Sequence, residues 1–167
     1  ERLFKSRQHM LSAKEEKILA HAGEVFQTAS NVFGMLNNAD IKFPTIKGED
    51  GEDTRLSHGR YALFLESKDR RVRKDAFIAL ANTYADMKNT LAATLTGSVK
   101  VHNLNTELRE FESARHAALF GNNIDVEVHQ ALIDGIHENI GMLHDYVELR
   151  KDALKLDKIE MYDVYVP

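Results

Sequence analysis

Helical periodicity dominates the N-terminal part of the chain. Apolar side chains recur every three or four positions between Ser12 and Leu36, as they do on one face of an α-helix. Ser12 and Glu15 have the spacing of a capping box, in which a hydroxyl and a carboxylate satisfy free N–H groups at the start of a helix. Glycines inside the stretch weaken it, and we therefore expect a break between two shorter helices at about residues 27–30.

The pattern changes to short extended segments after Ile41. Residues 43–47 and 54–56 flank an acidic segment that contains Gly48 and Gly51. Glycine adopts the positive φ angles that tight turns require. Proline at position 44 restricts its strand to the edge of a sheet, because it has no N–H to donate. The sequence predicts a single β-hairpin between residues 41 and 58.

A short helix and then a long one are predicted from the next apolar stripe. The short helix covers about residues 58–66, and Ser67 or Asp69 can cap the helix that follows. From residue 69 to 100 the apolar positions keep helical spacing without interruption, which predicts one helix about 45 Å long. Its stripe consists of Val72, Ala76, Leu80, Tyr84, Met87, Leu91, Leu95 and Val99.

Two further helices are expected in the C-terminal part. One covers about residues 104–120 and stops near Gly121, a usual C-terminal signal. The other begins with Asp125 as its cap and runs to about Leu154. Its apolar face carries Leu132, Ile136, Ile140, Leu143 and Val147.

These elements predict a mainly α-helical fold, about two-thirds helix, of long antiparallel helices with one small β-hairpin. We place a lobe boundary near residues 57–69, which separates an N-terminal domain, residues 1–67, from the first helices of a second domain, residues 68–167. The apolar stripes exceed what the short elements can cover. We therefore expect part of them to stay exposed, at side chains such as Leu132, Ile136 or Ile140, or Leu80, Met87 or Leu91.

Composition narrows the possible partners. The 167 residues are 43% hydrophobic and 29% charged, and a net charge of -4 with both signs interspersed provides no basic surface for nucleic-acid phosphates. No apolar run approaches the roughly 20 residues that cross a bilayer. The absence of cysteine excludes disulfides, thiolate metal sites and cysteine nucleophiles. We expect a soluble protein without nucleic-acid or membrane partners.

Eight histidines along the chain are candidate metal ligands. His137 and Glu138 begin like the zinc motif HExxH, whose two histidines stand four residues apart on one helical face. Gly141 occupies the position of the second histidine and supplies no ligand. His144 lies about 10 Å further along the helix, too far to share an ion with His137. Asp134 is better explained as a hydrogen-bonded partner of His137, and we predict no catalytic, cofactor-binding or metal-binding residue in this chain.

A basic cluster offers the remaining candidate chemistry. Residues 68–74 contain five cations in seven positions. Such a cluster can bind a peptide carboxylate, but we favour a solvated helix face whose cations pair with acids elsewhere. A Ser/His/Asp triad stays open, since the fold gathers its members, although no G-x-S-x-G motif is present.

Short sequence segments along the chain resemble those of one known family. They are Phe33 to Asp40, His58 to Tyr61, Leu65 to Arg73, Lys88 to Ala92, Asn122 to Ile124, His144 to Lys151 and Tyr162 to Pro167. In amino-acid sequence, order and spacing these segments resemble the bacterial oligoendopeptidase F family, from about Ser12 to the last residue. Asp125 stands where that family commonly has proline, and His129 where it commonly has tyrosine.

The resemblance implies a cytoplasmic zinc metalloendopeptidase, a hydrolase of short peptides that has a long helical channel. In that family the HExxH helix and the other zinc-site residues lie downstream of Tyr162 and Asp163, so none is assigned to this sequence. The chain opens with Glu1 instead of methionine and ends in an apolar extended run. We interpret it as an internal piece of such an enzyme, without catalytic residues, zinc or activity of its own.

Two functional hypotheses remain. In the first, this segment forms channel wall and structural support in a zinc peptidase that binds oligopeptides, and its exposed stripes pack on the zinc-bearing remainder of the same polypeptide. The isolated segment would then tend to self-associate. In the second, it is a free-standing helical interaction module without catalysis, with its stripes covered within the chain or by a dimer.

Overall fold

The computed structural model describes residues 2–167 and consists of two compact units, each built from two separate stretches of chain. Unit 1 contains the chain up to Leu36 together with Asn89–Ile140, and unit 2 contains Asn37–Lys88 together with Gly141–Pro167. Helices make up 71% of the residues, which confirms the mainly α-helical prediction. Across the described residues no helix is both long and apolar enough to span a membrane.

All regular secondary structure in the described part of unit 1 is helical. The capping box predicted at Ser12 is present, with the Glu15 N–H donating to Ser12 Oγ and the Ser12 N–H donating to the Glu15 carboxylate. The expected break also occurs, at Gln27. The elements are α1 (Arg2–Ser6), the 3-10 helix η1 (Arg7–His9), α2 (Ala13–Phe26), α3 (Thr28–Met35), α6 (Lys88–Leu108) from its second residue, α7 (Ala114–Phe120) and the first part of α8 (Val126–Ala153).

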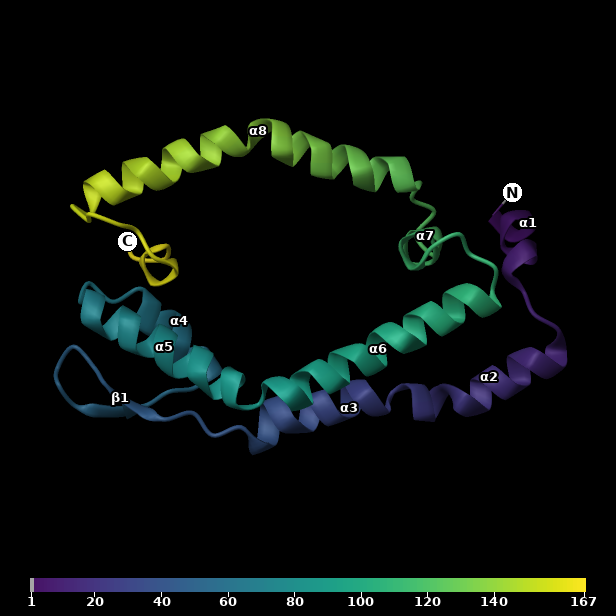
Figure 1. Ribbon diagram of the computed structural model, residues 1–167, viewed down its shortest axis with the longest axis horizontal. Coiled ribbons are helices and arrows are strands. Elements are labelled where there is room, and N and C mark those ends of the chain that lie inside the picture. The colour runs from purple at the N-terminus through teal and green to yellow at the C-terminus, as the bar shows by residue number, and fades with distance from the viewer. Residues whose placement is uncertain (1) are drawn as a thin grey trace. The chain divides into compact units, whose positions relative to one another are not determined.

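Helices α2 and α3 run antiparallel to α6 (Figure 1). Glu16 near the start of α2 pairs with Arg109 just after the end of α6, at 2.8 Å. Further along, a Cβ on Gly97 of α6 would lie only 2.8 Å from the Cβ of Ala29 in α3. The absence of a side chain at Gly97 therefore lets the two helices approach closely.

Unit 2 contains the only strands in the described part of the chain. Strand β1 (Thr45–Lys47) pairs antiparallel with β2 (Asp53–Arg55), and Thr45 lies opposite Arg55. Gly51 in the connecting turn has φ +79, which confirms the predicted hairpin and the turn role of its glycine. The other elements are the π-helical turn η2 (Leu36–Asp40), of which all but the first residue lies in this unit, α4 (His58–Leu65), α5 (Arg70–Asp86), the second part of α8 and the 3-10 helix η3 (Met161–Asp163).

The buried apolar core lies in unit 2. Every fully buried apolar side chain in the described structure belongs to this unit. In it, α5 packs against α4, β1 and η3. The core consists of Ile41, Phe43, Leu56, Leu65, Val72, Ala76 and Val166.

Two predicted helices are each divided in the structure. The single helix expected from 69 to 100 breaks at Met87, whose N–H bonds to Tyr84 O at 3.1 Å. The helix expected at 104–120 is interrupted after Leu108, because Glu110 adopts φ +55. Phe111 N–H then bonds to Thr106 O at 3.0 Å and closes a Schellman cap. Periodicity missed the first break because the apolar spacing continues across it, and missed the second because the cap uses glutamate rather than glycine.

Candidate functional site

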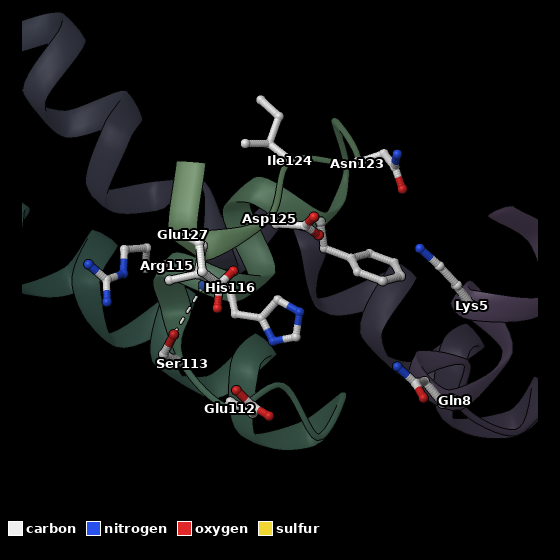
Figure 2. Close-up of a pocket in the computed structure, with 12 residues that line it drawn as sticks. Lys5, Gln8, Glu112, Ser113, Arg115, His116, Asn123, Ile124, Asp125 and Glu127 are labelled. Carbon is white, nitrogen blue, oxygen red and sulfur yellow. Dashed lines mark hydrogen bonds between the residues drawn. The ribbon is translucent and has the colours of Figure 1, made fainter. Parts of the chain in front are cut away.

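A hollow lies in unit 1, between α1, η1, α7 and the start of α8. Its volume is about 560 Å³. Figure 2 shows the His116 ring and the carboxylate of Glu112 on one side of it and Lys5 and Gln8 on the other. Asp125 and the segment before it form a further wall.

An aromatic cluster supports this hollow. The His9 ring stacks on Phe111 with 3.7 Å between ring centroids, and the Phe120 ring stands nearly perpendicular to it with 4.9 Å between centroids. His9 Nδ1 donates to Arg109 O at 2.7 Å, because a carbonyl oxygen only accepts. Arg109 also forms two hydrogen bonds with Glu16, at 2.8 and 2.9 Å. His9 and Phe111 thus hold the segment after α6 against the N-terminal residues.

Charges of both signs line the hollow. Glu112, Asp125 and Glu127 form no ion pair with any described residue, nor does Lys5 on the opposite side. His116 Nδ1 is buried and has no hydrogen-bond partner among the described groups. Such a hollow suits a polar ligand that carries both charges. On its wall the hydroxyl oxygen of Ser113 accepts from the backbone N–H of His116 at 3.0 Å and caps α7.

The histidine candidates for a metal site are separated from other ligands. His137 and Glu138 lie exposed on α8. Within residues 2–167 no group of three histidine, aspartate or glutamate side chains is arranged to hold a metal ion. The expected bond between Asp134 and His137 is wrong, since Asp134 instead accepts from Gln130 Nε2 at 2.9 Å. The residues present do not fit a zinc site. That this segment binds no zinc stays a prediction.

The basic cluster at 68–74 is largely paired with acids, as favoured. Arg71 pairs with Asp69 and Asp75, each at 3.2 Å. Arg70 and Arg73 both pair with Asp163, each at 2.8 Å. The expected solvated face is wrong for Arg73, however, because its side chain is only 3% exposed.

Asp163 is a buried carboxylate whose charged oxygens accept several hydrogen bonds. Its side chain is 0% exposed and receives hydrogen bonds from Arg70, Arg73 and the Glu160 N–H. Burial alone would raise the pKa of Asp163, but the hydrogen bonds from the two arginines outweigh it and hold the pKa below its ordinary value. The cluster therefore fixes the C-terminal segment to α5 and leaves no cation of the pair free for substrate.

Sequence patterns revealed neither the buried Asp163 nor the hollow near His116. Asp163 stood out only as part of a segment that resembles the oligoendopeptidase F family. The hollow near His116 is lined by residues more than 100 positions apart, from Lys5 to Asp125. The one usable signal was the presence of one histidine, two phenylalanines and three acidic residues within 111–127. That signal does not identify His9 as the ring on which Phe111 stacks.

Comparison with known proteins assigns the fold and these segments to a family. A model of peptidase family M3 matches residues 63–167, and an oligopeptidase F model matches residues 1–43. The chain belongs to peptidase family M3. It is 48% identical over its whole length to oligopeptidase PepF of Bacillus subtilis and 47% identical to an oligoendopeptidase F homolog of Lactococcus lactis subsp. lactis.

A solved structure agrees with these sequence matches. The crystal structure of oligoendopeptidase-F from Enterococcus faecium superposes with a TM-score of 0.96 and 47% identity, over 98% of this chain and 32% of that one. The present chain spans about a quarter of the length of the curated relatives, 25% for the B. subtilis protein and 28% for the L. lactis protein. It therefore corresponds to a segment of an oligoendopeptidase F-type peptidase.

Proposed function

We propose that this chain is the non-catalytic, channel-forming and supporting segment of a zinc metalloendopeptidase that hydrolyses short peptides. The proposal rests on the match of this whole chain to about one quarter of the length of two oligopeptidases. Zinc, peptide cleavage and a cytoplasmic location are inferred from the family resemblance. Water activation would reside in the remainder of the polypeptide, because no described group here is arranged as a metal site.

The exposed apolar face of α8 supports a packing role against that remainder. Leu132 is 63% exposed, Ile136 56% and Leu143 58%, and no residue of α8 is buried. Exposed apolar faces of this extent mark interfaces. The other residues expected to be bare are less so: Met87 is 38% exposed, and Leu80 and Leu91 are half-buried.

The total exposed surface supports the same proposal. The structure exposes 12361 Å² at a mass of 19.0 kDa. Two separate compact domains of half that mass each would together expose only about 10,000 Å². The excess of roughly 2,400 Å² is more than the about 800 Å² that each partner contributes to a standard protein–protein interface. We attribute it to surface that the rest of the parent polypeptide covers.

The family domains divide the chain differently from the compact units. We propose residues 1–67 as part of the oligopeptidase F N-terminal domain and residues 68–167 as the start of the peptidase domain. A boundary in this part of the chain is compatible with the two family models, because one ends at residue 43 and the other begins at residue 63, inside α4. Each compact unit then contains residues from both domains.

Three measurements on the 167-residue chain test the proposal. We expect no zinc binding at micromolar concentration by isothermal titration calorimetry and no cleavage of an internally quenched peptide, whereas the parent polypeptide shows both. We also expect the isolated chain to bind a hydrophobic dye, with binding lost when the remainder is supplied in trans. A monomer without dye binding would favour the free-standing module, and a stoichiometric micromolar zinc site would overturn the proposal.

A further inference from the structure

A second hollow lies within unit 2, between η2, the strand segments and the start of α4. Its volume is about 320 Å³. Its apolar lining comes from Ile41, Phe43 and Leu56, which are buried members of the core. A pocket with an apolar floor and a few convergent polar groups is the usual form of a small-ligand site.

Three cations line this hollow without a carboxylate. Lys42, Arg55 and Arg60 are lining residues, and no aspartate or glutamate is among the others. Lys42 Nζ donates to Ala39 O at 2.6 Å, and Arg60 Nη1 donates to Arg55 O at 3.1 Å. Within residues 2–167 none of the three forms an ion pair, unlike Arg70, Arg71 and Arg73 of the same unit. Their uncompensated charge attracts an anion.

A hydrogen-bonded chain gives the hollow a defined wall. Tyr84 OH donates to Asn37 Oδ1 at 2.7 Å, so its oxygen is left to accept from His58 Nε2, also at 2.7 Å. The edge of the His58 ring meets Phe43 with 4.9 Å between centroids. Asn37 lies in the π-helical turn η2, a conformation that is frequent at functional sites. These contacts fix the imidazole and the amide beside the cations.

We propose that this hollow binds the C-terminal end of an oligopeptide. The guanidinium groups of Arg55 and Arg60 present the planar donors that pair with a carboxylate, and Lys42 adds a point charge. The apolar floor accepts the last side chain of the peptide, which a bare inorganic anion lacks. The choice of a peptide rests on the proposed function, whereas the preference for a carboxylate rests on the cations themselves.

Direct binding to the 167-residue chain tests the proposal. The probes are the tripeptide acetyl-Ala-Ala-Leu with a free carboxylate, its C-terminal amide, and inorganic phosphate, each titrated by NMR. We expect amide shifts at residues 37–43 and 55–60, affinity for the amide about tenfold weaker than for the acid, and weaker binding as salt increases. Equal affinity for acid and amide, or tighter binding of phosphate than of the acid, would overturn the proposal.

Charge-removing variants locate the site. Lys42→Gln with Arg55→Gln removes two cations but leaves the Arg60 bond to the backbone, and we expect it to weaken binding of the acid about tenfold or more. Lys68→Gln with Lys74→Gln also removes two cations, from exposed side chains outside the hollow, and we expect unchanged affinity. Unchanged backbone spectra show that each variant is folded. A loss equal in both variants would indicate general electrostatics and contradict the site.

The parent peptidase separates this inference from the proposed function. We expect KM to rise about tenfold with unchanged kcat when the carboxylate of a peptide substrate is amidated or when the double variant is used. Cleavage that is indifferent to both changes refutes the site and leaves the proposed function intact. Absence of any peptide cleavage refutes the proposed function, while the NMR titration still decides whether the hollow binds a carboxylate.

Discussion

The two compact units bury their side chains very differently. Unit 2 holds every fully buried apolar side chain of the described structure, around Leu56 and Val72. In the described part of unit 1 only His9 and Thr94 are buried, and both are polar. Both units nevertheless contain helices with regular apolar stripes. Periodicity therefore identifies an apolar face, but it does not identify what covers that face.

The difference extends to charged groups. Unit 2 encloses the carboxylate of Asp163 between two arginines, whereas the Arg109–Glu16 pair of unit 1 is partly exposed, at 29% and 39%. A buried charge is costly to leave unpaired, and an exposed pair contributes little. Substitutions of buried residues in unit 2 should therefore destabilise the chain strongly. Substitutions on the exposed apolar faces of unit 1 should have little effect on stability.

The largest effect is expected at Asp163. Asp163→Asn leaves the buried guanidinium of Arg73 without its counter-charge and should destabilise the chain by about 3–5 kcal/mol. Chemical denaturation monitored by circular dichroism measures the loss. The control is Asp53→Asn, which removes the exposed ion pair with Lys47 and should cost less than about 1 kcal/mol. Similar losses in both variants would contradict the contrast.

The same carboxylate should also govern acid sensitivity. Because its pKa is below the ordinary 3.8 in the folded chain, its contribution is complete above that value and is lost as pH falls through the folded pKa. Asp163→Asn should flatten this acid limb of the stability curve.

The next largest loss of stability is expected when a leucine is truncated in unit 2 rather than in unit 1. Leu56 is 1% exposed in unit 2, and Leu132 is 63% exposed in the unit 1 part of α8. Leu56→Ala should cost about 2–5 kcal/mol through lost burial and a cavity, and Leu132→Ala should stay within about 0.5 kcal/mol. The denaturation midpoint of the 167-residue chain decides, and a large loss for Leu132→Ala would show that α8 is covered within the chain.

Glycine substitutions distinguish helices inside unit 1. A methyl group on Gly97 would meet Ala29 at 2.8 Å, whereas one on Gly135 of α8 meets nothing within 4 Å. Gly97→Ala should destabilise the chain by about 1–3 kcal/mol through overpacking. Gly135→Ala should stabilise it by up to about 1 kcal/mol through helix propensity. Thermal unfolding measures whether each variant is more or less stable than the unchanged chain. Stabilisation by Gly97→Ala would refute the close approach of α3 and α6.

The smallest effect is expected at the helix cap before the aromatic cluster. Glu110 has φ +55 and Asn123 has φ +54, each in a Schellman cap. Glu110→Gly should stabilise the chain by less than about 1 kcal/mol, because glycine reaches positive φ without the steric cost. Asn123→Gly should gain less still, since asparagine tolerates this conformation. Melting temperatures compare the two, and a loss in the glutamate variant would mean that its side chain has another role.

The sequence alone determined several local features and the family. The capping box at Ser12, the break at Gln27 and the hairpin around Gly51 follow from contacts within a few residues, and each was predicted correctly. Family words extending to Tyr162 identified the oligoendopeptidase F resemblance, which the comparisons confirmed.

Only the tertiary structure decided which side chains meet across long separations. The pairing of Arg73 with Asp163, the stacking of Phe111 on His9 and the convergence of Lys42 and Arg60 all join different elements. Periodicity reports which face of a helix is apolar, but these contacts depend on the direction in which each element leaves the one before it. That direction is set at single residues such as Glu110, whose positive φ no pattern of apolar positions records.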